Sequence, residues 1–187
     1  MKGSVVLCGV GGMGILKASE VIAHVVVQEG FSVCQSEVHG MAQRGGSVVT
    51  HLRYGEEVHS PLLSRGEADF MVAFEELEAL RYLPYLRRGG TVILNRFTMC
   101  PPGVDSSRYP KDIPETLESA GFAVLAAPAT DIALALGDIR VTNSVLLGVL
   151  SRVFPVGSER SWEEALAKAF QGKNLDRNLE AFRRGRA

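Results

Sequence analysis

Two glycine-rich segments contain the residues best suited to bind a ligand. The first, residues 9–14, has the sequence Gly-Val-Gly-Gly-Met-Gly and follows a short apolar run at residues 4–8. Glycines between a strand and a helix permit a tight turn, and they let backbone N–H groups and the helix N-terminus approach an anion such as phosphate. We expect either phosphate or nucleotide contact here or, alternatively, only close strand–helix packing. The glycines concerned are Gly9, Gly11, Gly12 and Gly14.

An acidic residue after the next strand is a further feature of dinucleotide-binding turns, where it binds the ribose hydroxyls. Glu37 occupies such a position, after a strand predicted at residues 31–35. This spacing leaves open an autonomous oxidoreductase that binds NAD or FAD through the glycine-rich turn.

The second glycine-rich segment, residues 37–46, combines charged and polar side chains with glycines. It is too polar for a core element, and it follows a strand at the edge where open α/β sheets bind ligands. Arg44 can pair bidentately with a phosphate or carboxylate, and His39 can titrate near neutrality. We expect contact with a ligand or with another subunit rather than a bare solvated loop. The residues predicted to take part are Glu37, His39, Gly40, Gln43, Arg44, Gly45 and Gly46.

The other titratable residues show no catalytic or metal-binding pattern. Glu75, Glu76 and Glu78 stand in the first turn of a predicted helix, where acids stabilise the positive end of the helix dipole. A role as paired catalytic carboxylates is the less favoured interpretation. The chain has 4 His and 3 Cys, without metal-ligand spacing or a CxxC motif. We expect no catalytic residue, no metal site and no iron–sulfur cluster in this chain, since such a cluster usually takes four thiolates.

The composition is that of a globular protein with little net charge. The 187 residues are 46% hydrophobic, and Lys+Arg 20 against Asp+Glu 21 gives a formal charge of −1. No basic field is available to bind nucleic acid, and no apolar run approaches the roughly 20 residues of a membrane span. The separated cysteines indicate a reducing compartment, and no secretory signal is recognised. We therefore expect a cytoplasmic protein.

Alternating strand and helix patterns predict an α/β fold with one domain, residues 1–187. The first strand–turn–helix–strand unit predicts that strands 4–8 and 31–35 pair in parallel. We expect a three-layer α/β/α sandwich around a Rossmann-like, mostly parallel sheet. The predicted strands are 4–8, 31–35, 47–53, 57–59, 68–73, 91–94 and 121–126, and the predicted helices are 15–29, 75–86, 114–120, 130–136, 143–154 and those opening at 161 and 174.

Three local features refine these elements. Residues 57–59 are predicted to form a hairpin with the strand at 47–53. Asn143 is predicted to cap the helix that it opens. Ser161 to Glu164 fits a capping box.

Several short motifs occur in the order typical of one protein family. They are Gly-Val-Gly-Gly-Met-Gly at 9–14, His-Gly-Met-Ala-Gln-Arg-Gly-Gly-Ser-Val at 39–48, Ser-Pro at 60–61, Gly-x-Ala-Asp at 66–69, Phe-Glu-x-x-Glu-Ala at 74–79 and Gly-Gly at 89–90. Together they resemble the gamma-type subunit or domain of 2-oxoacid:ferredoxin oxidoreductases. The 39–48 segment is most similar to the small (beta) subunit of the indolepyruvate branch. Met13 departs from the family, where glutamine is common.

This resemblance implies a heteromeric, thiamine-diphosphate-dependent enzyme that converts a 2-oxoacid, in this branch an aryl pyruvate such as indolepyruvate, into acyl-CoA, CO₂ and reduced ferredoxin. A larger partner subunit would carry thiamine diphosphate and the iron–sulfur clusters, and ferredoxin would be reached through the complex. The isolated chain would be inactive. Both glycine-rich segments would face the shared active site, with Arg44, Gly45 and Gly46 near anionic groups of CoA, substrate or the partner's cofactor. An autonomous nucleotide-binding oxidoreductase and a ligand-binding module remain the alternatives.

Overall fold

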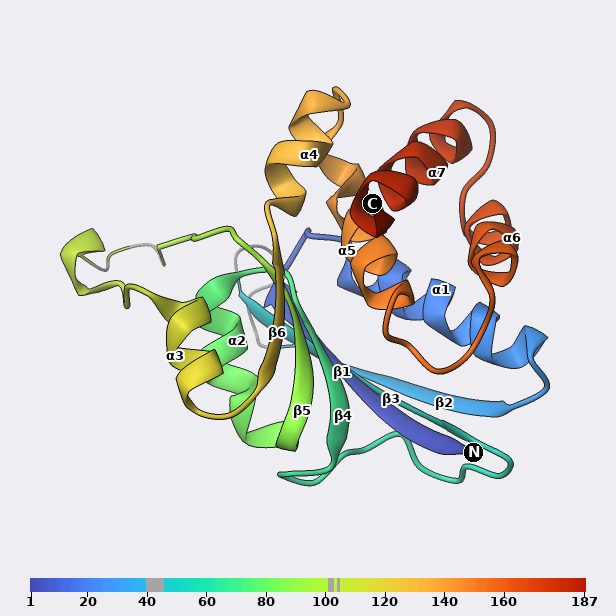
Figure 1. Ribbon diagram of the computed structural model, residues 1–187, viewed down its shortest axis with the longest axis horizontal. Coiled ribbons are helices and arrows are strands. Elements are labelled where there is room, and N and C mark those ends of the chain that lie inside the picture. The colour runs from blue at the N-terminus through green and yellow to red at the C-terminus, as the bar shows by residue number, and fades with distance from the viewer. Residues whose placement is uncertain (40–45, 101–102, 104) are drawn as a thin grey trace.

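The computed structural model of the chain describes residues 1–39, 46–100, 103 and 105–187 (Figure 1). Among these residues, no helix combines the length and the apolar character that crossing a membrane requires. The strands are β1 (Lys2–Val10), β2 (Ser32–His39), β3 (Ser47–Gly55), β4 (Ala68–Ala73), β5 (Leu86–Asn95) and β6 (Ala123–Ala127). The helices are α1 (Ile15–Gln28), α2 (Glu76–Tyr82), α3 (Ile113–Ser119), α4 (Ala129–Ala135), α5 (Thr142–Ser151), α6 (Glu159–Ala169) and α7 (Lys173–Arg186), with 3₁₀ turns at Leu83–Tyr85, Ser106–Arg108 and Ile139–Val141.

The strands form one mixed sheet in the order β2-β3-β1-β4-β5-β6. Strands β1, β4, β5 and β6 run parallel to one another, whereas β3 is antiparallel to both β1 and β2. The predicted direct pairing of the first strand with the strand after α1 is therefore wrong, because β3 lies between them. Strand β3 pairs with β1 from Lys2↔Gly55 to Val10↔Ser47. The predicted α/β class is confirmed, with a sheet more mixed than expected.

Helices cover both faces of the sheet, as a three-layer sandwich requires (Figure 1). Helices α1 and α4–α7 lie on one face, and α2 and α3 lie on the other. Strand β1 contributes to both cores: Val5 and Leu7 pack under α1, whereas Val6 and Cys8 pack on the side of α2. Because β1 is buried on both faces, its sequence is continuously apolar rather than alternating.

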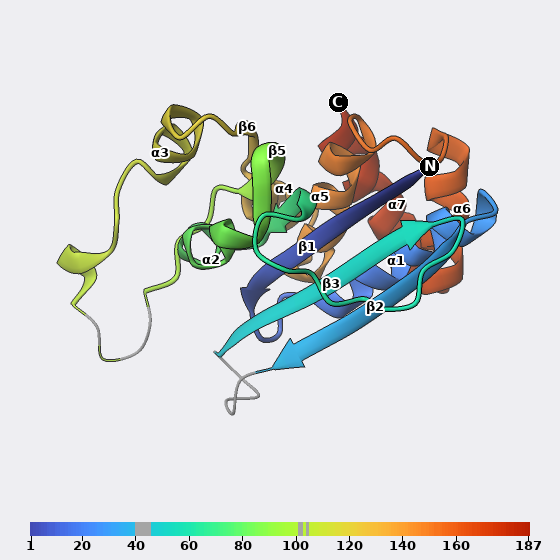
Figure 2. The ribbon, with the colours of Figure 1, turned by 90° about the horizontal axis from the view of Figure 1, so that it is seen from below.

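A long connection, residues 56–67, leads from β3 to β4 across the sheet (Figure 2). The predicted hairpin between 47–53 and 57–59 is wrong, because residues 57–59 form no strand and β3 pairs with the preceding strand β2. The turn residues after β3 therefore begin a covering segment and not a return strand.

His51 of β3 holds this connection against the sheet. Its Nδ1 accepts a hydrogen bond from the backbone N–H of Leu63 at 3.1 Å, and its ring centroid lies 5.0 Å from that of Tyr85. The side chain is only 5% exposed. Burial, followed by the charge of Arg53, lowers the pKa of His51. The neutral imidazole is therefore the form that accepts this bond.

Helices α5 and α7 cross through one glycine of each helix. A Cβ at Gly148 would lie 2.1 Å from the carbonyl oxygen of Phe182, and a Cβ at Gly185 would lie 1.9 Å from that of Val145. Neither position can hold a side chain unless the two helices separate. This close approach lets α7 cover α5, every residue of which is buried.

Two predicted helix starts are wrong. Helix α6 begins at Glu159, and its capping box joins Ser158 to Ser161, one turn before the predicted box. Helix α5 begins at Thr142 after an N-cap at Val141. Asn143 therefore lies inside the first turn and is not the cap.

Lowering the pH should destabilise the protein through His51. Because the pKa of His51 is lowered in the folded state, the unfolded chain binds the proton more readily once the pH falls below about 6.5. The free energy of unfolding should decrease as the pH falls through this range and be independent of His51 above it. Urea unfolding at pH 5.5 and 7.5 measures this difference. In His51→Asn, whose amide oxygen accepts without titrating, the difference should shrink, and an unchanged difference would contradict the assignment.

Gly185→Ala should lower the free energy of unfolding by about 2–3 kcal/mol, because overpacking at the α5–α7 crossing outweighs the better helix propensity of alanine. Urea unfolding is again the measurement. The control is Arg184→Ala, an exposed substitution in the same helix, which should change stability by less than about 0.5 kcal/mol. Equal stability of the Gly185 variant and the wild type would mean that the helices do not cross this closely.

Candidate functional site

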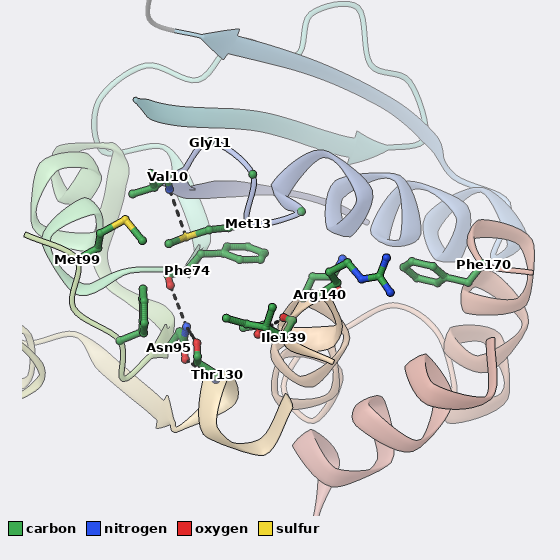
Figure 3. A pocket seen from close by; sticks show the side chains of 15 residues that line it. Val10, Gly11, Met13, Phe74, Asn95, Met99, Thr130, Ile139, Arg140 and Phe170 are labelled. Atoms are coloured by element: carbon green, nitrogen blue, oxygen red, sulfur yellow. Dashed lines mark hydrogen bonds between the residues drawn. The ribbon is translucent and has the colours of Figure 1, made fainter. Parts of the chain in front are cut away.

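A cavity of about 590 Å³ opens at the carboxyl edge of the parallel strands. Val10 at the end of β1, Phe74 directly after β4 and Asn95 at the end of β5 all line it (Figure 3). The chain passes from β1 to α1 on one face of the sheet and from β4 to α2 on the other. The cavity therefore lies at the topological switch point, where open α/β sheets bind ligands.

The glycines of the 9–14 turn serve different purposes. A Cβ on Gly9 would lie 2.7 Å from Cβ of Phe74, so Gly9 permits close packing at the end of β1. Gly12 and Gly14 have φ angles of 102° and 80°, in the left-handed region that favours glycine. Gly11, Gly12 and Gly14 line the cavity. Close packing thus explains Gly9 and contributes at Gly14, where a Cβ would lie 2.9 Å from Nδ2 of Asn143. Gly11 and Gly12 are explained by their place in the cavity wall.

The turn is joined directly to the end of the second glycine-rich segment. The backbone N–H of Gly11 donates to the carbonyl oxygen of Gly46 at 2.9 Å. This contact follows from the sheet, since Ser47 pairs with Val10 in the adjacent strand. The amide of Gly11 is therefore engaged within the protein, and the amides at the start of α1 are better placed to bind an anion.

The N-termini of α1 and α5 meet at the cavity. Gly14 precedes α1, and Thr142 and Asn143 form the start of α5; all three residues line the cavity. Neither helix has a side-chain cap. At the start of α1 the first-turn N–H groups lack intrahelical acceptors. At the start of α5 the N–H of Thr142 donates to the carbonyl oxygen of Ile139, and that of Ser144 donates to Oδ1 of Asn143. The helix dipoles add positive potential at both ends. Two helix N-termini together favour a negatively charged group at this end of the cavity.

Asn143 lies between these two helix ends. It is 3% exposed, and its Oδ1 accepts the backbone N–H of Ser144 at 2.8 Å. Its Nδ2 is close enough to Gly14 that a Cβ there would approach within 2.9 Å. No hydrogen bond from Nδ2 is found among the described residues. The amide Nδ2 is therefore a donor at the cavity wall, and no described residue accepts a hydrogen bond from it.

The remaining wall is mainly apolar. The thioether Sδ of Met13 is held 3.4 Å from the backbone N of Val10 (Figure 3). Such walls, combined with a positive end, suit an elongated ligand that has both apolar and anionic parts. The apolar side chains of the wall are Met13, Phe74, Phe97, Met99, Ile139 and Phe170.

Asn95 is a polar lining residue whose hydrogen bonds are made within the protein. Its Nδ2 donates to the carbonyl of Phe74 at 2.9 Å and to Oγ1 of Thr130 at 2.8 Å. Its Oδ1 accepts the backbone N–H of Thr130 at 3.2 Å. Asn95 therefore ties the ends of β4 and β5 to the start of α4, a structural role.

Arg140 stands at the cavity mouth with its guanidinium held by Asp138. Its Nε and Nη2 donate to the two carboxylate oxygens at 2.9 and 2.8 Å. These hydrogen bonds, together with the charges of Arg140 and Arg177, lower the pKa of Asp138 to about 2. The Arg140 side chain is 77% exposed. An exposed ion pair such as Arg140–Asp138 contributes little to the stability of the fold. It does hold the Arg140 guanidinium in one position at the edge of the cavity.

Glu75, the N-cap of α2, and Glu76 and Glu78 in its first turn are buried and do not line the cavity. Glu75 caps the helix by accepting the N–H of Glu78 at 2.9 Å, which agrees with the predicted stabilisation of the helix start. Burial raises the pKa of Glu76 despite the charge of Arg96. Burial also raises the pKa of the Cys8 thiol, and the charges of Glu78 and Glu75 raise it further. Cys8 is therefore a protonated, inert thiol.

Glu37 is not placed as a dinucleotide site requires. It lies on β2, opposite Thr50 of β3. Adjacent strands are about 4.8 Å apart, so β2 stands roughly 10 Å from β1. The acid is therefore not on the strand next to the glycine-rich turn, and the arrangement that supported NAD or FAD binding is absent.

The rest of the second glycine-rich segment is described in part. His39 is the last residue of β2, and Gly46 precedes β3. The predicted site residues Gly40, Gln43, Arg44 and Gly45 lie outside the described residues. Within the described ranges, no group of three or more His, Cys, Asp or Glu is arranged to hold a metal ion.

Sequence reasoning did not identify the residues that form the apolar wall. Phe97 and Met99 lie in an irregular segment, and Phe170 follows a helix; no motif connects them. Phe74 could have been found, because it directly follows an apolar strand at the ligand-binding edge. The sequence indicates Asn143 only as a helix cap, since its approach to Gly14 depends on tertiary structure.

Known proteins similar to this chain belong to one family. Residues 4–187 match the family model described as pyruvate ferredoxin/flavodoxin oxidoreductase. The chain is 40% identical over 191 residues to the indolepyruvate oxidoreductase subunit IorB of Methanothermobacter thermautotrophicus, an alignment that covers 99% of this chain and 96% of that protein.

Solved structures share the fold. The gamma subunit of a keto/oxoacid ferredoxin oxidoreductase from Geobacter sulfurreducens aligns with a TM-score of 0.74 at 21% identity, covering 98% of this chain and 96% of that one. The 2-oxoglutarate:ferredoxin oxidoreductase of Magnetococcus marinus aligns with a TM-score of 0.76 at 25% identity, covering 98% of this chain but 30% of that longer chain. The chain therefore belongs to the pyruvate ferredoxin/flavodoxin oxidoreductase family, as a subunit of a 2-oxoacid:ferredoxin oxidoreductase.

Proposed function

We propose that this chain is the small subunit of an enzyme that oxidises an aryl 2-oxoacid such as indolepyruvate, forming acyl-CoA and CO₂ and reducing ferredoxin. The 40% identity over nearly the whole length of an indolepyruvate oxidoreductase subunit supports this substrate class. A larger partner subunit supplies thiamine diphosphate and the iron–sulfur clusters. The chain itself has 3 Cys, fewer than the four thiolates of a usual cluster.

In this proposal the cavity at the carboxyl edge binds part of CoA. The observation that carries it is the meeting of two helix N-termini beside Asn143, whose Nδ2 has no acceptor among the residues that the structure describes. These groups would hold a phosphate of CoA, while Phe97 and Met99 would contact its less polar pantetheine chain. The Magnetococcus enzyme is described with coenzyme A bound. When bound, CoA supplies the thiol that receives the acyl group, and this chain's residues bind and orient it.

The second glycine-rich segment completes the proposed site. Ser47 and Gly46 place its end beside the glycine-rich turn. We retain Arg44 as a group that pairs with an anionic part of CoA, substrate or the partner's cofactor, because a guanidinium binds phosphate and carboxylate bidentately. His39, Gly40, Gln43 and Gly45 belong to the same proposed surface.

Asn143→Asp should raise the KM for CoA roughly tenfold in the assembled complex. The substitution preserves side-chain size, and an acid in the first turn suits the helix dipole, so the fold is kept. The added charge repels a phosphate at short range, for which about 1.4 kcal/mol corresponds to tenfold. Steady-state kinetics under anaerobic conditions measure the effect. Asn174→Asp, at an exposed position of α7, is the control and should leave the KM unchanged.

Arg44→Ala should lower turnover or CoA affinity of the complex about tenfold or more, since a charge-assisted pair is lost. Arg44→Lys should recover only part of the loss, because an ammonium does not make the bidentate contact. The thermal unfolding midpoint of both variants should match the wild type. Unchanged kinetics, including the dependence on CoA, would remove Arg44 from the site.

The function itself is tested by purifying the tagged chain anaerobically with its partners. Co-purification of a larger iron-bearing chain, and CoA-dependent dye reduction faster with indolepyruvate than with pyruvate or 2-oxoglutarate, would support the proposal. Activity with a different 2-oxoacid would refute the aryl substrate class. A chain that purifies alone, without partner or activity, would refute the proposed complex.

A further inference from the structure

Glu75, the N-cap residue of α2, holds a wall of the cavity. The carboxylate is 1% exposed, and its Oε1 accepts both the backbone N–H of Met99 at 2.9 Å and the hydroxyl of Tyr109. The same hydroxyl accepts the backbone N–H of Leu77 at 3.0 Å. Met99 lines the cavity. Glu75 therefore fixes where the wall segment after β5 passes the cavity.

Glu78, one turn further along α2, holds the start of β3. Its carboxylate is buried at 5% exposure, and its Oε2 accepts the hydroxyl of Ser47. The Ser47 hydroxyl also lies 3.0 Å from that of Tyr82, and Arg81 donates to Oε1 of Glu78 at 3.0 Å. Ser47 is the first residue of β3, so Glu78 sets the point at which the chain enters the sheet.

The contact at Ser47 extends to the glycine-rich turn. Gly46 directly precedes Ser47, and its carbonyl oxygen accepts the N–H of Gly11 at 2.9 Å. Two hydrogen bonds, joined by the peptide bond between Gly46 and Ser47, thus connect Glu78 to Gly11, which lines the cavity.

We propose that Glu75 and Glu78 are positioning residues for the CoA site, Glu75 by fixing the Met99 wall and Glu78 by fixing the glycine-rich turn through Ser47. This role rests on the proposed function. Stabilisation of the helix dipole alone would be satisfied by exposed acids. Here both carboxylates are buried, and each accepts hydrogen bonds from a segment distant in sequence, which a dipole role does not require. Hydrogen bonds to a charged acceptor are the stronger kind, which suits a fixed geometry.

Two conservative substitutions separate the two contacts. Ser47→Ala removes the hydroxyl bound to Glu78, and Tyr109→Phe removes the hydroxyl bound to Glu75. Amide hydrogen exchange of the full chain should become about tenfold faster at the N–H of Gly11 in the first variant, and at that of Met99 in the second, each leaving the other amide unchanged. Ser47→Thr, which restores a hydroxyl, should return the exchange at Gly11 toward the wild-type rate.

The assembled complex provides the functional measurement. Both variants should weaken equilibrium CoA binding about tenfold while kcat at saturating CoA stays within about twofold, because the site is misplaced but the chemistry is not altered. Leu166→Ala, at a fully buried position of α6, is the control for general destabilisation. It should speed exchange at many amides together and leave the Kd for CoA unchanged.

Unaltered exchange at Gly11 in Ser47→Ala and at Met99 in Tyr109→Phe would overturn the proposal. So would altered exchange with unchanged CoA binding, since the contacts would then be structural only. If the wild-type complex does not bind CoA, the proposed function fails and the positioning role fails with it. The CoA-binding measurement on the wild-type complex gives this result before any variant is tested.

Discussion

The antiparallel pairing of β3 with β1 determines where both glycine-rich segments lie. The pairing runs to Val10↔Ser47, the last residue of one strand and the first of the other. Since the glycine-rich turn follows Val10 and the second glycine-rich segment ends just before Ser47, one register brings the two segments together. A shift of one residue would turn every β3 side chain to the opposite face of the sheet. It would also move His51 away from Leu63.

Close approach between elements is the second constraint on the site. Gly9 permits contact with Phe74, and Gly14 permits contact with Asn143. The Gly9–Phe74 contact lets the ends of β1 and β4 pack closely at the switch point. The Gly14–Asn143 contact brings the start of α5 to the start of α1. Both positive helix ends therefore depend on residues without a side chain. The glycine-rich turn serves as much to bring protein segments together as to expose backbone amides.

Much of the fold could be predicted from the sequence, because apolar runs and glycine turns are local features. The position of β3 could not. The continuous apolar sequence of β1 indicates burial on both faces, but it does not say which strand lies on either side. Glu37 illustrates the consequence: its spacing from the turn is that of a dinucleotide site, yet one intervening strand removes the geometry. The apolar cavity wall could not be predicted either, since Phe97 and Met99 lie in an irregular segment after β5 and Phe170 follows the distant helix α6.

The glutamates of α2 show how one sequence pattern can have a local and a long-range meaning at the same time. An acid at the start of a helix is sufficiently explained by the dipole, and Glu75 does cap α2. Its burial and its bonds to Met99 and Tyr109 add a function that no helical pattern reveals. The same holds for Glu78 and Ser47. A buried carboxylate is costly unless donors surround it, so each such residue requires specific partners. In this chain those partners belong to the segments that border the cavity.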